Sequence, residues 1–194
     1  MTTVTRAAVP PRELTDALVD ELAKHALVHE EVTLSSGVKA SYFIDAKRVI
    51  LQASGFRLLN ELMQHYIREL GVDAVGGLTL GADAIACAAL FNGPPHVKGF
   101  FVRKEPKPHG LQKLIEGPPL VAGDRCLVVD DVVTSGASTI KAIKALQEQN
   151  VEIRGVLAIL DRLAGGAERI EEAAQAPFMA LTTIDEVFPG HDRS

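Results

Sequence analysis

Residues 127 to 136 read LVVDDVVTSG and place two carboxylates directly behind an apolar run. Asp130 and Asp131 are followed by small and hydroxyl-bearing residues, and these lead into a helical pattern. Carboxylates accept hydrogen bonds from vicinal hydroxyl groups. A small-residue turn before a helix directs backbone N–H groups and the helix dipole at one point, which suits a phosphate. The segment therefore predicts a site for a sugar phosphate.

Four hydroxyl side chains in this turn and its helix could donate to a phosphate: Thr134, Ser135, Ser138 and Thr139. Gly136 would let the backbone approach the ligand closely. The segment is neither a G-x-x-x-x-G-K-[ST] loop nor a G-x-G-x-x-G dinucleotide loop. The structural alternative is a strand that ends in Asp and is followed by an N-capped helix.

The rest of the chain shows apolar strand patterns that alternate with helical ones. This alternation predicts an α/β fold with a mostly parallel central sheet flanked by helices. Ligands of such sheets bind beyond the carboxyl ends of the strands, which is where Asp130 and Asp131 would lie. The expected strands are within 39–51, 73–80, 97–103, 125–131 and 153–161. The expected helices are within 10–28, 54–70, 83–91, 137–149 and 166–174.

The segment 104–119 interrupts this alternation with four prolines, two glycines and mixed charges. Long connections without an element of their own are commonly lids or binding loops. Arg103, Lys104, Lys107 and His109 gather at its start and favour a lid over a surface excursion. We expect a single domain over 1–194, with residues up to about 50 forming a small N-terminal hood and 104–119 a mobile catalytic loop.

Composition excludes several classes of protein. The net charge of -5 argues against a broad nucleic-acid surface. No signal peptide or membrane-spanning apolar run is visible, so we expect a cytoplasmic protein that contacts neither membrane nor nucleic acid. Cys87 and Cys126 lie in apolar stretches and are expected to be reduced core thiols. The histidines other than His109 show no metal-ligand grouping.

The segment CLVVDDVVTSGAST resembles the phosphoribosyl-diphosphate signature of the type I phosphoribosyltransferases, in which apolar residues, two acids and a T-[AS]-G turn recur in this order. The resemblance implies the fold of that family and a substrate site in this segment. The residues that it assigns to phosphoribosyl diphosphate are Asp130, Asp131, Val132, Val133, Thr134, Ser135, Gly136, Ala137 and Ser138. The signature does not choose the base.

Three further stretches resemble the orotate phosphoribosyltransferases: LSSGVKASYFID at 34–45, RKEPKPHGLQKLIEG at 103–117 and LDRLAGG at 160–166. The second is similar to the R-K-E-x-K-x-H-G loop of that family. Arg162 is placed to bind the carboxylate of orotate bidentately, and Thr134 could assist it. Tyr42 and Phe43 resemble the segment that covers the pyrimidine, although such an aromatic pair is more often core.

The resemblance implies transfer of the phosphoribosyl group to orotate, with release of pyrophosphate, in pyrimidine biosynthesis. Lys107 and His109 would close over the leaving group, with Arg103 and Lys104 in support. A Mg²⁺ ion, held mainly by substrate oxygens and water near Asp130 and Asp131, would act as a Lewis acid. The family also implies a homodimer in which the loop acts in the site of the neighbouring subunit.

Two positions depart from the family pattern. Many members carry a lysine where this chain has Ser35, and another where it has Gly81. The second lies in the expected pyrophosphate loop of Thr79, Leu80, Gly81 and Ala82, which then offers backbone amides without a cation. Weaker affinity for the diphosphate, greater dependence on Mg²⁺ or support from Lys39 are the open consequences.

Three other functions compete with this interpretation. A purine phosphoribosyltransferase would not need the R-K-E-x-K-x-H-G loop or Arg162. A regulatory protein that binds phosphoribosyl diphosphate without catalysis would be expected to lack Lys107 and to carry a basic DNA-binding region. A bifunctional enzyme that also decarboxylates the product would need a longer chain. The sequence favours the orotate enzyme.

Overall fold

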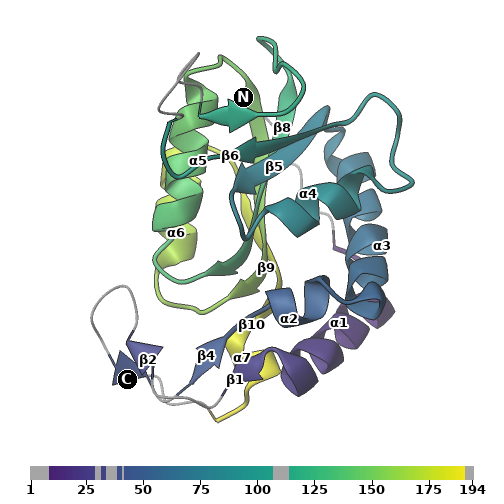
Figure 1. Ribbon diagram of the computed structural model, residues 1–194, viewed down its shortest axis with the longest axis vertical. Helices are drawn as coiled ribbons and strands as arrows, with labels where there is room; N and C mark the ends of the chain where they lie inside the picture. Colours follow the sequence, from purple (N-terminus) through teal and green to yellow (C-terminus); the bar gives the residue numbers. More distant parts are fainter. Residues whose placement is uncertain (1–8, 29–31, 34–38, 41, 107–113, 191–194) are drawn as a thin grey trace.

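The computed structural model describes residues 9–28, 32–33, 39–40, 42–106 and 114–190. Its centre is a 6-stranded sheet in the order β10-β9-β8-β5-β6-β7 (Figure 1). The strands pair in parallel, except that β7 runs antiparallel to β6. The sheet consists of β5 (Ala74–Leu78), β6 (Lys98–Val102), β7 (Ile115–Glu116), β8 (Arg125–Val133), β9 (Glu152–Asp161) and β10 (Phe178–Thr183). The expected mostly parallel α/β architecture is confirmed.

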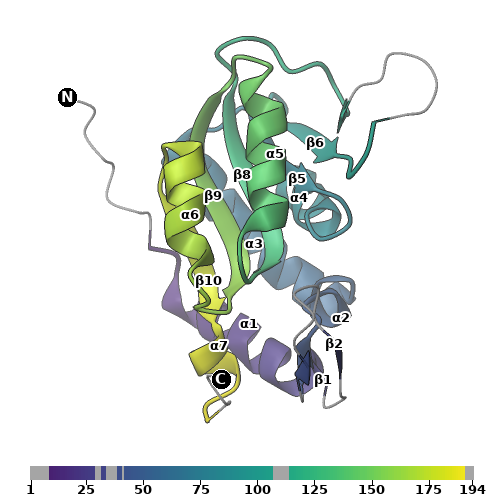
Figure 2. The ribbon, with the colours of Figure 1, turned by 90° about the vertical axis from the view of Figure 1, so that its left-hand side faces the viewer.

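Helices cover both faces of this sheet, as Figures 1 and 2 show. On one face Leu127 and Val129 of β8 belong to a core cluster shared with α1 (Arg12–His25), α3 (Ala53–Leu70) and α4 (Asp83–Leu90). On the other face Cys126 and Val128 pack in a second cluster with α5 (Ala137–Gln147) and α6 (Gly166–Ala174). The period of two along β8 is that of a strand buried on both faces.

Short elements lie beyond one end of the sheet (Figures 1 and 2). In two antiparallel pairs, β1 (Leu27–Val28) joins β4 (Phe43–Ile44) and β2 (Val32–Thr33) joins β3 (Lys39–Ala40). The short helices α2 (Lys47–Ile50) and α7 (Ile184–Val187) lie at the same end. The strand expected within 39–51 is therefore confirmed only in its first half, because the second half is helical.

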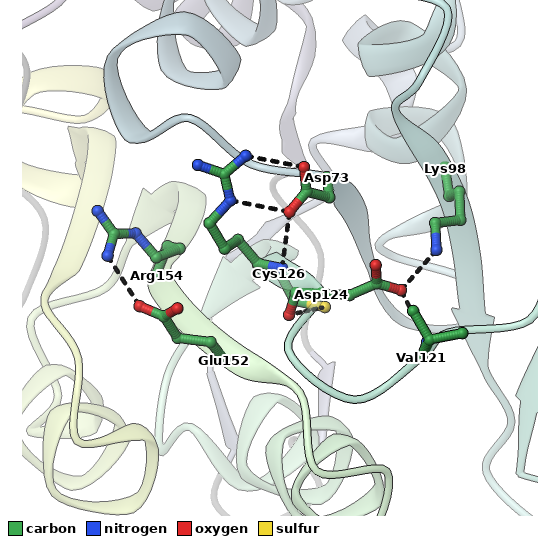
Figure 3. Close-up of polar contacts among 8 residues, drawn as sticks. Asp73, Lys98, Val121, Asp124, Cys126, Glu152 and Arg154 are labelled. Atoms are coloured by element: carbon green, nitrogen blue, oxygen red, sulfur yellow. Dashed lines mark hydrogen bonds and ion pairs between the residues drawn. The ribbon is translucent and has the colours of Figure 1, made fainter.

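A polar cluster joins the opposite, amino-terminal ends of the strands (Figure 3). Arg125 donates from Nε and Nη2 to the two carboxylate oxygens of Asp73, at 2.8 and 2.9 Å. The Arg125 guanidinium holds the pKa of the Asp73 carboxyl well below its usual range. Lys98 pairs with Asp124, which also accepts a bond from the backbone N–H of Val121. Charged groups thus join the starts of β5, β6 and β8.

Three details differ from expectation. The segment 104–119, expected to lack an element, contributes β7 to the sheet edge. The edge strand β10 was not expected. Cys126 is buried, but Cys87 is exposed on α4, so only one of the two free cysteines is a core thiol. Among the described helices none is long and apolar enough to cross a membrane.

Candidate active site

The site is built where β8 continues past its neighbour β5. Pairing of β8 with β5 stops at the register of Val128 with Gly76, whereas pairing with β9 continues to Val133. Asp130 and Asp131 therefore lie within β8, and the expected strand end at these residues is wrong by two positions. Beside them, β5 has ended and the chain turns through residues 79–82 into α4. The loss of one strand neighbour opens the space around the two carboxylates.

Asp130 is bound to the helix that follows the strand. Its Oδ2 accepts hydrogen bonds from Ser138 Oγ at 3.1 Å and from Thr139 Oγ1 at 2.7 Å, and its Oδ1 accepts one from the N–H of Asp131 at 3.0 Å. The residue is only 4% exposed. Burial raises the pKa of Asp130 to about 6, and the neighbouring charge of Asp131 acts in the same direction.

Asp131 is instead bound by a residue of α2. Its Oδ2 accepts a hydrogen bond from Lys47 Nζ at 2.9 Å, and its Oδ1 accepts one from the N–H of Val132 at the same distance. Lys47 also lies 3.0 Å from Asp45 Oδ1. A Cβ atom on Gly81 would lie 2.4 Å from Asp131 Oδ1. The turn of residues 79–82 and the start of α2 therefore meet at this one carboxylate.

The turn after β8 leads into the first residues of α5. Gly136 adopts φ +76° and precedes the helix, and a Cβ atom there would lie 2.8 Å from Ile170. Thr134, Ser135, Ala137 and Ser138 are exposed, whereas Val133 is buried. The N-cap residue of α5 is Gly136, which has no side chain to accept hydrogen bonds from the first N–H groups of the helix. Its first N–H groups and the helix dipole remain directed at the space where a phosphate is expected.

Arg162 follows β9 and is joined to this turn, since its backbone N–H donates to the carbonyl of Val133 at 2.9 Å. Its guanidinium lies 5.4 Å from the ring centre of Tyr42, and its Nη2 donates to the Tyr42 hydroxyl at 3.4 Å. Tyr42 is buried and packs edge-on against Phe188 at 5.3 Å. Phe43 is 38% exposed on β4. Arg162 and Tyr42, which the resemblance assigns separately to orotate, thus lie in contact with each other.

The expected catalytic loop is described only at its ends. Arg103 Nε donates to the carbonyl of Glu105 at 3.3 Å, and Arg103 Nη1 lies 3.6 Å from Glu116 Oε1 on β7. Lys141 on α5 donates to the carbonyl of Lys104, whose side chain is exposed. These contacts of Arg103 are with residues at the two ends of the loop, and not with Asp130 or Asp131. Lys107 and His109 lie outside the described residues, as does Ser35.

Sequence reasoning missed Lys47, Phe188 and the contact of Thr139 with Asp130. Lys47 is 84 positions from Asp131, and its own segment carries a strand-like pattern that gives no sign of the contact. Phe188 lies in a segment to which the sequence analysis assigned no element. Thr139 was named only as a phosphate donor, but it is 1% exposed and donates to Asp130.

The donors present fit a hard divalent cation only in part. Asp130 and Asp131 supply carboxylate oxygens, which Mg²⁺ prefers. Asp131 is already paired with Lys47, and Asp130 is hydrogen-bonded to α5. Among the described residues no group of three or more metal-binding side chains is present. These residues are compatible with an ion that receives most of its ligands from substrate and water.

Comparison with known proteins shows what the whole chain is similar to. The family model described as "Phosphoribosyl transferase domain" matches residues 74–177. The chain is 42% identical over 170 residues to an orotate phosphoribosyltransferase from Corynebacterium glutamicum (strain R), covering 88% of this chain and 91% of that one. A crystal structure of the orotate phosphoribosyltransferase of Mycobacterium tuberculosis superposes with a TM-score of 0.77 at 37% identity, covering 90% and 99%. A structure of that protein in complex with 5-phospho-alpha-D-ribosyl 1-diphosphate gives a TM-score of 0.73 at 34% identity, covering 90% and 98%.

The raised pKa of Asp130 predicts a pH-dependent stability. A carboxyl group whose pKa is higher in the folded than in the unfolded chain favours folding most at low pH, and this contribution is lost as pH rises through the folded pKa of about 6. Relative to wild type, Asp130→Asn should therefore gain about 2 kcal/mol between about pH 4 and about pH 7. Urea unfolding of both proteins without ligand measures this difference.

Asp20→Asn serves as the control for that experiment, because it removes an exposed carboxylate on α1. A stability difference between Asp130→Asn and wild type that stays constant across this pH range would contradict the prediction.

Proposed function

Because the chain belongs to the orotate phosphoribosyltransferase family, we propose roles for its site residues in the reaction of that family. The enzyme transfers the phosphoribosyl group of 5-phosphoribosyl 1-diphosphate to orotate, and it releases orotidine 5′-monophosphate and pyrophosphate. The observation that carries the assignment of roles is the convergence of three features at one sheet edge. These are the aspartate pair, the uncapped start of α5 and the Arg162–Tyr42 contact.

The sugar phosphate binds along β8 and the turn after it in this proposal. The 5-phosphate accepts hydrogen bonds from the N–H and hydroxyl groups of residues 134–138, where the dipole of α5 favours negative charge. The ribose hydroxyls donate to Asp130 and Asp131. Contacts to Thr139 and Lys47 hold the two carboxylates in separate positions before the substrate arrives.

The base binds beside Arg162. A guanidinium presents a planar pair of N–H donors that matches the carboxylate of orotate. The Tyr42 ring, fixed by Phe188, limits the positions of that guanidinium. Thr134 lies on the same side because the N–H of Arg162 is bonded to Val133. This arrangement would orient the ring nitrogen of orotate toward the sugar carbon while Phe43 borders the site.

Displacement of pyrophosphate develops positive charge on the ribose and negative charge on the leaving group. We propose that Lys107 and His109, with Arg103 and Lys104, bind the leaving group when the loop closes and excludes water. Asp130 and Asp131 would lie beside a Mg²⁺ ion, which supplies Lewis-acid stabilisation of the diphosphate. We further propose a homodimer in the cytoplasm, in which each loop serves the site of the partner subunit.

The competing functions are less well supported. The chain is about 40% identical to curated orotate phosphoribosyltransferases over most of its length, and Arg162 lies against Tyr42 at the edge of the sheet. A purine enzyme has no use for that guanidinium. A regulatory protein that binds phosphoribosyl diphosphate would not need the Lys107 side chain, which the sequence retains.

Ultraviolet absorbance of orotate gives the direct test of the reaction and of the loop. Wild type with phosphoribosyl diphosphate and Mg²⁺ should consume orotate, whereas Lys107→Ala should do so at least about a hundredfold more slowly, because it lacks the cation at the leaving group. Lys113→Ala, in the same segment but outside the proposed set, is the matched control. Orotate left untouched by wild type would refute the assigned base.

Arg162→Lys tests the base contact. The variant keeps one positive charge but loses the bidentate geometry, so KM for orotate should rise at least about tenfold while KM for phosphoribosyl diphosphate changes less than about threefold. Steady-state kinetics with each substrate varied in turn give both constants. Equal changes in the two constants would indicate a general disturbance of the sheet edge.

Mixing two inactive variants tests the shared loop. In a dimer of Lys107→Ala with Asp131→Asn, a loop that acts across the interface leaves one site with both residues intact. Random exchange of subunits should then restore roughly a quarter of wild-type activity. Each variant alone supplies the baseline, and mixtures that stay at this baseline would place the loop in the site of its own chain.

A further inference from the structure

Lys47 is a cation at the site that the roles proposed above leave without a part in catalysis. It begins α2 in the hood, and its side chain is 37% exposed. Its ammonium lies 2.9 Å from Asp131 and 3.0 Å from Asp45. Burial acts to lower the pKa of Lys47, but its hydrogen bonds to Asp131 and Asp45 outweigh burial and raise that pKa. The side chain is therefore charged at neutral pH.

Gly81 places the pyrophosphate loop against the same carboxylate. A Cβ atom at this position would lie 2.4 Å from Asp131 Oδ1 and 3.0 Å from Asp130 Oδ1. Any side chain on residue 81 would push the Asp131 carboxylate away from its present position. A lysine at position 81 would therefore disturb the present contact between Lys47 and Asp131. The missing side chain at Gly81 and the Lys47 ammonium thus both determine where the Asp131 carboxylate lies.

The carboxylates around Lys47 would oppose the binding of a further anion unless a cation lies beside them. The Lys47 ammonium contacts the carboxylates of both Asp45 and Asp131. In the loop of residues 79–82, the Gly81 position lies close to the carboxylates of Asp131 and Asp130. A diphosphate entering that loop brings further negative charge and would be repelled. Among the described residues, Lys47 is the cation that pairs with Asp131. Its four-carbon stem lets the ammonium turn between neighbouring acceptors.

We propose that Lys47 binds the diphosphate of the substrate and the pyrophosphate product, in place of the cation that the turn lacks at Gly81. In the free site it neutralises Asp131. When ribose hydroxyls occupy Asp131, the ammonium donates to diphosphate oxygens at the Thr79–Ala82 loop. This proposal rests on the proposed function and extends it to a residue of the hood.

Binding of magnesium pyrophosphate, measured by titration calorimetry without orotate, tests this role. Lys47→Met keeps most of the stem but removes the charge, and it should weaken pyrophosphate binding about tenfold. Lys47→Arg should bind within about threefold of wild type, because charge and donors remain. Arg48→Met, which removes an exposed cation from the next position of α2, is the matched control and should bind like wild type.

Kinetics and melting temperature distinguish this role from simple anchoring of the hood. Under the proposal, Lys47→Met raises KM for phosphoribosyl diphosphate and leaves KM for orotate within about twofold of wild type. Unchanged pyrophosphate affinity would overturn the proposal. An equal rise in KM for both substrates, together with a lower melting temperature, would also overturn it. That result would mean that Lys47 only anchors the hood to the sheet. The calorimetric result holds even if wild type fails to consume orotate, so the two proposals fail separately.

Discussion

Two carboxylates on consecutive residues of a strand leave the backbone toward opposite faces of the sheet, because side chains alternate along a strand, and different groups can therefore bind them. In β8 this alternation sends Asp130 toward Ser138 and Thr139 of α5, and Asp131 toward Lys47 of the hood. The two charges are thereby bound by separate groups. The two groups that bind these carboxylates also form the rest of the proposed site. The turn before α5 would bind the phosphate, and Lys47 lies beside the proposed pyrophosphate loop.

The register of the sheet makes the division possible. If β5 paired with β8 along its whole length, its backbone would occupy the space beside Asp130 and Asp131. Instead β5 ends at Leu78 and the chain crosses beside Asp131 at Gly81, where there is no room for a Cβ atom. The carbonyl of Val133 then binds the N–H of Arg162, so the base contact is fixed to the end of the strand that carries the aspartates.

Local patterns in the sequence predicted most of the central sheet. The continuous apolar run of residues 126–129 indicated a buried strand, and the apolar spacing of α3 and α5 is helical; both signals are carried by neighbouring residues. Asp130 and Asp131 were singled out because they follow such a run, and Arg162 because its segment resembles one of the orotate phosphoribosyltransferases. The contact of Lys47 with Asp131 and that of Phe188 with Tyr42 join distant segments, and no local signal records them. For the same reason β7, with only two residues, was hidden by the prolines around it.

The polar cluster of Asp73, Arg125, Lys98 and Asp124 lies at the end of the strands away from the reaction. Its contacts hold the starts of three strands together without touching the groups that would meet substrate. Substitutions in this cluster can therefore change the thermal stability of the protein without changing the site, which lies at the other end of the same strands. Thermal adaptation and catalytic adaptation can proceed in this molecule along separate mutational routes.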